Sequence, residues 1–220
     1  MCEDQNQKNG YQVSLEFIIK VFKMPLLSGI ISLSLILLFG FLLWILFPKF
    51  LETPKYEVEL SDSEFQLRKY DSFITTRVGT NGNQNEALRK GFRPLVRFIG
   101  AKERSSKKIS MTVPVMQEKT SSEGNWLVSF SMPSKYSLNN LPKPTNNQLK
   151  QKIIPARLMA VIKFNGRANN DLLERKEKEL RKWIAERDFL VVGLVQYYFY
   201  NDPTTPGMFR RNEVLLEVTK

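Results

Sequence analysis

The sequence predicts an α+β fold: a barrel-like antiparallel sheet with two helices, preceded by one transmembrane helix. Three observations lead to this prediction. Residues 26–47 form an uncharged apolar run, and a strand-helix-strand-strand order then occurs twice after residue 56. Finally, Gly82 and Gly166 align the two copies at an offset of 84 residues. A duplicated unit of this kind forms one antiparallel sheet carrying two helices, with a cleft expected between the halves.

The apolar run has the length and the flanks of a membrane anchor. Its 22 residues contain no charge. At about 1.5 Å per residue they span roughly 33 Å, close to the thickness of a bilayer's hydrocarbon core. Signal-peptide apolar regions are shorter, and no small-residue cleavage site follows this one. We therefore predict a single-pass anchor that contacts the lipid bilayer through residues 26–47.

The anchor divides the chain into four predicted parts. Residues 1–25 form a flexible polar tail, residues 26–47 the transmembrane helix, residues 48–55 a linker and residues 56–220 the folded domain. Lys20 and Lys23 favour a cytoplasmic tail, although Lys49 and Lys55 nearly balance them. We expect the folded domain on the non-cytoplasmic side of the membrane.

The first copy begins with two alternating runs in residues 56–80, separated by turn residues at 61–63. A helix is predicted over residues 85–101. It is followed by strands at 108–116 and 125–133, and by a Pro/Asn-rich loop at 138–148.

The second copy repeats this order. A strand is predicted at 156–166, a helix at 169–189 and strands at 191–200 and 210–218. The 84-residue offset also aligns three apolar pairs, namely Leu88 with Leu172, Val96 with Leu180 and Ile99 with Trp183.

The absence of histidine excludes several kinds of chemistry. With no histidine and a single cysteine, Cys2, the chain cannot form the usual zinc sites or an intrachain disulfide. Ser-His-Asp and Cys-His catalysis are excluded, and so is histidine ligation of a haem iron.

The chain is strongly basic, with a formal net charge of +11. Residues 50–220 contribute +10 of this, from 29 basic and 19 acidic residues. Such a balance favours anionic partners, although a solvated surface rich in Lys and Arg is the alternative interpretation. Nucleic-acid binding is not expected, because the basic residues are dispersed and the sequence contains no recognisable motif of a nucleic-acid-binding domain.

The first predicted helix has two faces of different character. At about 100° per residue, Leu88, Leu95 and Ile99 form a core stripe that Phe98 extends. The other face combines cations with apolar side chains: Arg89, Phe92, Arg93, Val96 and Arg97. This face suits an apolar, carboxylate-bearing ligand, because arginine binds carboxylates through its bidentate fork. The alternative is a solvated arginine ridge with Phe92 partly in the core.

The second helix is predicted to be structural. Glu174 with Lys178 and Glu177 with Arg181 form i,i+4 pairs on an outer face, while four apolar residues pack inward: Leu173, Leu180, Trp183 and Ile184. The aromatic run Tyr197–Tyr200 is expected to provide core and cross-strand packing, with at most half of it lining a cleft.

Several motifs resemble the signature stretches of the SOUL haem-binding protein family. They are "KISMTVPV" at 108–115, "VSFSMP" at 128–133, "LPKP" at 141–144 and "YNDPTTPGMFRRNEVLLEV" at 200–218. Their order and spacing match the family across roughly residues 56–218. The resemblance implies a duplicated α+β barrel-like fold, shared with bacterial small-molecule-binding domains of the gyrase-inhibitor type, and binding of haem or a related tetrapyrrole.

The resemblance also implies that ligand-binding residues lie on the first helix, at Arg89, Phe92, Val96 and Arg97. This chain departs from members that ligate the iron through histidine. It is similar instead to members that hold a tetrapyrrole by an apolar helix face and basic groups. Met111, Tyr70 or another tyrosine is an alternative ligand.

The leading hypothesis is a membrane-anchored carrier or buffer of haem or a related tetrapyrrole, without enzymatic activity. The alternative is a module that uses the same fold to bind another amphipathic small molecule or a protein. A hydrolase using a carboxylate such as Glu213 is a third hypothesis, disfavoured because no paired-carboxylate spacing occurs. For Arg210, Arg211 and Glu213 we predict a structural role at the start of the last strand, with Arg211 and Glu213 on one face.

Overall fold

The computed structural model describes residues 29–102, 107–120 and 124–220. The chain divides into two compact units, Met1–Phe47 and Pro48–Lys220, which are described separately. The predicted polar tail, residues 1–25, lies outside the described residues.

The first unit contributes most of an apolar helix, Gly29–Phe50, which ends in the short 3-10 turn η1 (Phe47–Phe50). The helix is long and apolar enough to cross a membrane, a property that anchors and signal sequences share. Its side chains are largely exposed, as the apolar residues from Ile30 to Leu43 show.

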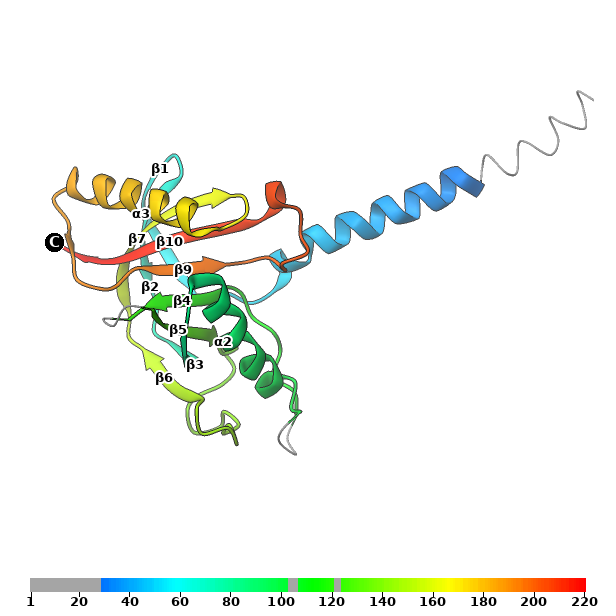
Figure 1. Cartoon of the computed structure of the whole chain (residues 1–220), viewed down its shortest axis with the longest axis horizontal. Coiled ribbons are helices and arrows are strands. Elements are labelled where there is room, and N and C mark those ends of the chain that lie inside the picture. Colours follow the sequence, from blue (N-terminus) through cyan, green and yellow to red (C-terminus); the bar gives the residue numbers. More distant parts are fainter. Residues whose placement is uncertain (1–28, 103–106, 121–123) are drawn as a thin grey trace, which may run out of the picture. The chain divides into compact units, whose positions relative to one another are not determined.

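The second unit is built on one antiparallel sheet that curls into a half-barrel (Figure 1). Along the sheet the strand order is β1-β2-β7-β10-β9-β4-β5-β3-β6, and β8 pairs separately with β10. The elements are β1 (Tyr56–Asp62), β2 (Phe65–Tyr70), β3 (Phe73–Asn81), α2 (Gln84–Ile99), β4 (Val115–Lys119), β5 (Asn125–Ser131), β6 (Lys150–Ile154), β7 (Arg157–Asn165), α3 (Asn170–Ala185), β8 (Leu190–Val191), β9 (Gln196–Phe199), η2 (Gly207–Phe209) and β10 (Arg211–Thr219).

The predicted duplication is confirmed by the topology. In the first copy, β3-α2-β4-β5, strand β5 lies between β3 and β4; in the second, β7-α3-β9-β10, strand β10 lies between β7 and β9. The two copies join where β4 pairs with β9. The strand that precedes each copy pairs with the other copy, since β2 pairs with β7 and β6 with β3. Each half therefore completes the sheet of the other.

The glycines that align the copies have the same backbone conformation. Gly82 has φ +115° and Gly166 has φ +124°, a region that side chains strongly disfavour. Within the helices, an offset of 85 matches the buried pairs Leu95 with Leu180 and Ile99 with Ile184, whereas the N-caps Asn83 and Asn169 match at 86. The predicted pairing of Val96 with Leu180 stays a prediction.

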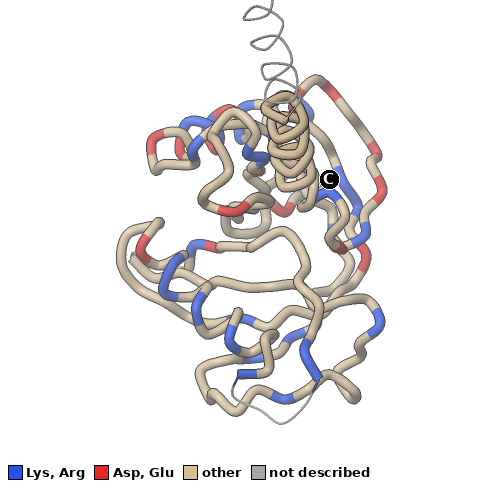
Figure 2. Tube along the Cα trace, turned by 90° about the vertical axis from the view of Figure 1, so that its right-hand side faces the viewer, with Lys and Arg blue, Asp and Glu red and all other residues tan. Residues whose placement is uncertain are grey.

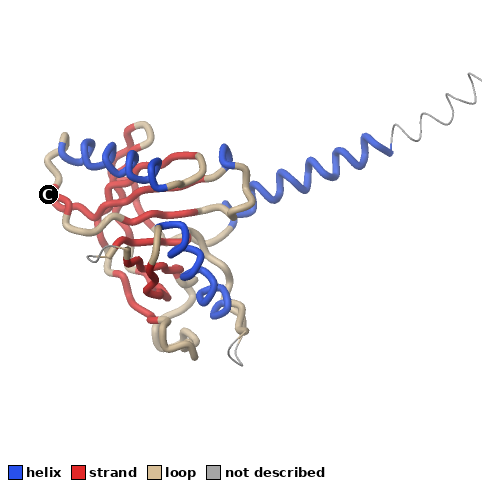
Figure 3. The backbone as a smooth tube through the Cα atoms, viewed as in Figure 1, coloured by secondary structure: helices blue, strands red, loops and turns tan. Residues whose placement is uncertain are grey.

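The two faces of the sheet differ sharply. Residues directly opposite one another in an antiparallel ladder project from the same face. On this basis Val78, Val128, Tyr197, Val214 and Ile162 share one face, which α2 and α3 cover (Figure 3). We call the opposite face the helix-free face.

Three apolar clusters form the core. One lies under α3, where the predicted inward residues Leu173, Leu180, Trp183 and Ile184 are all buried. A second lies under α2, around Leu95 and Phe98. The third fills part of the helix-free face and includes Tyr70, Met159 and Tyr198. The aromatic run is core packing as predicted, with Tyr197, Tyr198 and Tyr200 all buried on one face or the other.

Some predicted strands differ from the observed ones. Residues 56–80 contain three strands rather than two, with turns near Ser63 and Asp71. The predicted strand at 108–116 is wrong over its first seven residues: β4 begins at Val115, directly after Pro114, which has no N–H to donate to a ladder. The sequence reading also missed β6 and the two-residue β8.

The residues predicted as a linker, 48–55, lie against the folded domain. Val113 donates its N–H to the Glu52 carbonyl at 2.9 Å, and Ser134 donates its N–H to Glu52 Oε1 at 2.6 Å. Leu51 packs against the third cluster. This segment, which leads out of the apolar helix, is therefore part of the folded unit.

Candidate functional site

Helix α2 carries all five residues predicted to bind a ligand. Its N-cap is Asn83, whose side chain accepts a hydrogen bond from Glu86 N at 2.9 Å. An i,i+4 ion pair of 2.8 Å between Glu86 and Lys90 supports the first turns, and the helix continues unbroken through Pro94. Gly91 faces the sheet, where an added Cβ would lie 2.5 Å from Val128 Cβ. This close approach fixes which face of α2 is turned outward.

The structure brings the five residues together on the outer surface of α2. Arg89, Phe92, Arg93 and Arg97 are exposed, and Val96 is half-buried against the core. Phe92 is 36 % exposed, and its inner edge contacts the Phe130 ring at a centroid distance of 5.5 Å. We call these five residues the α2 surface. On the helix Phe92 neighbours Arg89 and Val96, at spacings of three and four residues, so its ring lies at the edge of the row of arginines.

The net charge of the body is concentrated in the half that contains α2. Residues 72–156 contain 14 Lys and Arg but only four Asp and Glu, a net charge of +10. The rest of the body, residues 50–71 and 157–220, holds 15 of each and is neutral. In Figure 2 blue positions accordingly predominate in the lower part of the body, whereas both colours occur above. The α2 surface therefore lies in the part of the molecule that most attracts anions.

The five residues of the α2 surface suit the organic part of a tetrapyrrole better than its metal ion. Phe92 and Val96 offer apolar contact to a flat macrocycle, and arginines suit propionate groups. Within the described ranges no three His, Cys, Asp or Glu side chains gather as a metal site. Of the alternative iron ligands, Tyr70 is buried and its hydroxyl accepts a hydrogen bond from Arg68 at 3.1 Å, whereas Met111 is half-buried at the cluster under α2.

The outer face of α3 forms some of the ion pairs predicted from sequence. Arg181 and Glu177 pair at 2.8 Å as expected. Glu174 and Lys178 form no ion pair with each other in the part of the chain that the structure describes. Lys176 instead bridges Glu179 at 2.7 Å and Glu64 at 3.1 Å. Helix α3 is thus tied to the loop between β1 and β2, which agrees with a structural role.

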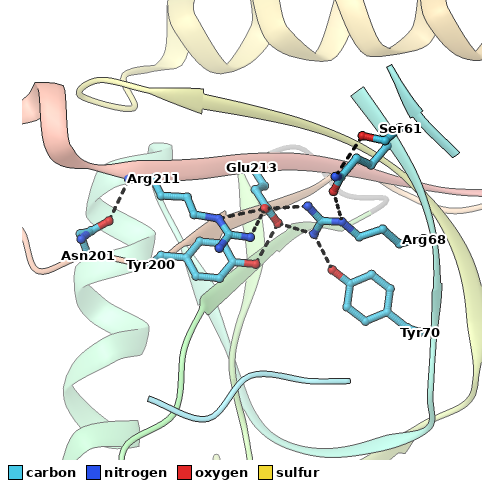
Figure 4. Close-up of polar contacts among 8 residues, drawn as sticks. Ser61, Arg68, Tyr70, Tyr200, Asn201, Arg211 and Glu213 are labelled. Atoms are coloured by element: carbon cyan, nitrogen blue, oxygen red, sulfur yellow. Dashed lines mark hydrogen bonds and ion pairs between the residues drawn. The ribbon is translucent and has the colours of Figure 1, made fainter. Parts of the chain in front are cut away.

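On the helix-free face, a buried ion-pair network links β2 to β10 (Figure 4). Arg68 donates from Nη1 and Nη2 to the two carboxylate oxygens of Glu213, at 2.9 and 3.0 Å. Arg211 Nη2 donates to Glu213 Oε1 at 2.6 Å, and the Tyr200 hydroxyl donates to Oε2 at 2.8 Å. Arg68 and Glu213 are both fully buried. The predicted placement of Arg211 and Glu213 on one face of the last strand is confirmed, and their contacts agree with a structural role; Arg210 donates to the carbonyls of Thr205 and Pro203.

This network fixes the protonation of its members. Burial acts to raise the pKa of Glu213, but the hydrogen bonds and charges of Arg68 and Arg211 outweigh burial and lower this pKa. Burial raises the pKa of Tyr200 well above its ordinary value, and the Glu213 charge adds to the effect. Glu213 is therefore ionised at neutral pH and lacks the raised pKa of a general acid.

Besides a cleft of about 590 Å³ that borders α2 at Lys90 and Pro94, two clefts of ligand size lie away from this helix. The first, of about 420 Å³, lies between the 52–55 segment and residues 131–138, over Phe73 and Ile74. The second, of about 630 Å³, opens beside the buried network and is called the basic cleft. Its lining residues are Tyr56, Val58, Gln66, Arg68, Lys163, Phe164, Asn165 and Arg211. The cleft expected between the two halves measures only about 60 Å³ where Gln84 and Tyr197 meet α3, too small for a tetrapyrrole.

Sequence reasoning did not single out the residues of the basic cleft as a site. Arg68 and Glu213 stand 145 positions apart, and only the pairing of β2 with β7 and of β7 with β10 brings them together. The one available signal was the placement of Arg211 and Glu213 on the same strand face. A polar cavity of about 20 Å³ beside Arg77, Glu118 and Arg157 was also missed; it has room for a single water molecule.

Comparison with known proteins identifies a family that shares the sequence motifs and solved structures that share the fold. The family model described as SOUL heme-binding protein matches residues 51–217. A search of the curated proteins found no match. Among solved structures, the chain is similar to the EcmrR C-terminal domain, at 11 % identity and a TM-score of 0.55, covering 75 % of this chain and 98 % of that one. It is also similar to a hydrolase from Listeria innocua, at 10 % identity and a TM-score of 0.50, covering 73 % and 94 %. At these identities the two structures support the fold alone, which agrees with the predicted α+β half-barrel.

Proposed function

The chain belongs to the SOUL heme-binding protein family, and on that premise we propose that it binds haem or a related tetrapyrrole at the α2 surface. The observation that carries the proposal is an exposed aromatic ring, Phe92, beside a row of three arginines, Arg89, Arg93 and Arg97. In this arrangement the macrocycle lies against Phe92 and Val96, and the arginines pair with its propionates.

The spacing of the arginines supports this mode of binding. Residues four apart on a helix have neighbouring side chains, with Cβ atoms about 5–6 Å apart. Arg89, Arg93 and Arg97 therefore form one row that can hold two carboxylates. Neither Arg89 nor Arg93 forms a hydrogen bond or an ion pair with another residue that the structure describes, so both are available to a ligand.

The role we propose is that of a holder or carrier of the ligand rather than an enzyme. Glu213, the carboxylate considered for hydrolysis, is buried and bound by two arginines, and its pKa is lowered. A carboxylate in this state serves the fold. The ligand is held without histidine, through the macrocycle and its carboxylates.

We also propose that the apolar helix anchors the protein in a membrane, with the folded unit on the non-cytoplasmic side. Support comes from the length and composition of Gly29–Phe50. In sealed membrane vesicles of known orientation, a protease confined to the non-cytoplasmic side should digest the folded unit. Complete protection there, or release of the full chain by carbonate washing, would contradict this topology.

The experiment that tests tetrapyrrole binding is a hemin titration of residues 48–220, which include all three core clusters, followed by the visible absorption of hemin. Wild type should bind saturably. The variant R89Q/R97Q should bind about tenfold more weakly or worse, the effect of losing one or more charge-assisted hydrogen bonds.

The matched control removes the same two charges from α3. K178Q/K182Q should bind hemin like wild type, because both lysines lie on the exposed face of the other helix. Equal binding by wild type and R89Q/R97Q would show that the propionates are not held at the α2 surface. Absence of saturable binding by wild type would refute the proposed function itself.

A second candidate is an interaction module for an acidic partner. The net charge of +10 on residues 72–156 favours it, as does the convex shape of an exposed helix face. Hemin-independent capture of an acidic protein, abolished by R89Q/R97Q but retained by K178Q/K182Q, would distinguish this function.

A further inference from the structure

The basic cleft has properties of a second ligand site, on the sheet face opposite α2. We propose that it binds the phosphate group of a phosphorylated small molecule or of a phospholipid headgroup. The proposal does not depend on tetrapyrrole binding, because it rests on different residues on the other side of the sheet.

The buried network holds more positive than negative groups. In the buried network one carboxylate, Glu213, faces two guanidinium groups, those of Arg68 and Arg211. The network thus retains one positive charge although two of its members are fully buried. The excess charge lies on Arg211, whose side chain is partly exposed at the cleft, so water screens it only in part.

Lys163 adds a second positive charge to the same cleft. It lies opposite Glu213 in the ladder between β7 and β10, so both side chains project from the helix-free face. Lys163 is half-buried and forms no ion pair with the residues that the structure describes. None of the residues lining the cleft is acidic. The cleft therefore carries two positive charges that no lining carboxylate offsets, which matches a phosphate dianion.

The groups around these charges suit an anion joined to an organic part. The Arg211 side chain remains 43 % exposed while it holds Glu213. Gln66 and Asn165 add amide groups at the cleft, and the Tyr56 ring lies 4.3 Å from the Arg68 guanidinium carbon. A volume of about 630 Å³ is larger than an inorganic anion needs. Tyr56 and Val58 can contact the remainder of the ligand.

The test compares two lysine variants of the full chain in vesicles of phosphatidylcholine. K163Q removes the unpaired charge from the cleft and leaves the Arg68–Glu213 pair intact. K69Q is the control: Lys69 is exposed on the neighbouring strand β2, where it projects from the other face beside Leu67. The probe is inorganic phosphate, and the measurement is thermal unfolding, with sodium chloride added to equal ionic strength as the reference.

Phosphate should raise the unfolding temperature of wild type and K69Q above that in chloride. In K163Q the apparent dissociation constant for phosphate should rise about tenfold, since one charge-assisted contact is lost. An unchanged constant in K163Q, or an equal loss in K69Q, would overturn the proposal.

A second arm distinguishes the source of the phosphate. Vesicles that also contain phosphatidate should by themselves stabilise wild type relative to K163Q if the site takes a lipid headgroup. If it takes a soluble phosphate ester, only added glycerol phosphate should produce that difference. Failure of all three probes would refute the proposal. Hemin affinity should be equal in wild type and K163Q, so tetrapyrrole binding is tested separately.

Discussion

Glu213 shows how one residue can determine the behaviour of a whole sheet face. It lies on β10 and receives hydrogen bonds from Arg68 on β2, from Arg211 two positions before it on β10 and from Tyr200 just after β9. Burying an ion pair costs desolvation energy, so such a pair is a weak source of stability in itself. Removing one partner is costly, however, because the remaining charge is then buried without compensation.

Loss of the Glu213 charge should leave the two arginines of the network without compensation. Substitution E213Q leaves two guanidinium groups facing a neutral amide, and it should lower the free energy of unfolding by about 3–5 kcal/mol. Urea denaturation of residues 48–220 measures the change. E186Q is the control, since among the described residues the Glu186 side chain pairs only with Lys182, at 3.8 Å and in an exposed position. A loss of unfolding free energy below about 1 kcal/mol in E213Q would mean that the buried charges of Arg68 and Arg211 do not need Glu213 for compensation.

Acid provides an independent test of the same residue. The pKa of Glu213 is lowered in the folded state, so folding is favoured while the carboxylate is ionised in both states. This stability is fully present above about pH 4.3, the ordinary glutamate value, and is lost as the pH falls towards the folded pKa. The stability difference between wild type and E213Q should therefore narrow from pH 7 to pH 3. A constant difference over this range would contradict a lowered pKa.

At the scale of elements, α2 combines a tight inner contact with an exposed outer surface. Its inner face approaches β5 at Gly91, and its outer face carries the α2 surface. Any shift of the helix away from the sheet would therefore move the proposed ligand contacts as well.

We predict that G91A destabilises the protein although alanine favours helices. The gain in helix propensity is about 1 kcal/mol, whereas overpacking costs about 1–3 kcal/mol. The added Cβ would stand 2.5 Å from Val128 Cβ. G79A is the control, because an added Cβ there meets nothing within 4 Å. A loss of stability in G79A as large as that in G91A would contradict the contact with Val128 as the cause.

The sequence predicted the elements whose signals are local. Both helices, their buried stripes and the glycines at 82 and 166 follow from periodicity and turn chemistry. The short strands β6 and β8 were missed because their pairing with β3 and β10 comes from the tertiary fold. The start of β4 was misplaced because the apolar pattern continues through Pro114, where the ladder cannot.

The two candidate sites also differ in whether a local sequence pattern predicts them. The α2 surface lies on one helix, so a helical wheel could assemble its five residues. The basic cleft needs three strands, with Arg68, Lys163 and Arg211 on β2, β7 and β10. Its charge balance depends on Glu213 being opposite Lys163, and no local pattern gives that register.

At the scale of the whole molecule, the sheet separates two surfaces of different chemistry. One face carries the helices and the proposed tetrapyrrole surface. The other holds the buried network, the basic cleft and the docked 48–55 segment. The duplicated halves also differ in charge, since residues 72–156 carry the entire +10 of the body. The duplication therefore supplies the fold, and the charge of one half supplies its preference for anions.

At alkaline pH the protein should unfold because the buried tyrosines of the helix-free face ionise. Burial raises the pKa of Tyr198 to about 12, and it also raises the pKa values of Tyr70 and Tyr200. Their stabilising effect is fully present below about pH 10, the unfolded value, and is lost as the pH rises above it. Stability should fall by up to about 1.4 kcal/mol per pH unit for each tyrosine. Circular dichroism measures it; a slope in Y198F as steep as in wild type would contradict this origin.

The most direct test of the central claim locates bound hemin on the folded unit. Hydrogen–deuterium exchange of residues 48–220, measured with and without saturating hemin, should show added protection over 84–99, and R89Q/R97Q should lose that protection. Protection confined to β2, β7 and β10, or hemin binding without any change over α2, would contradict a tetrapyrrole site on the α2 surface.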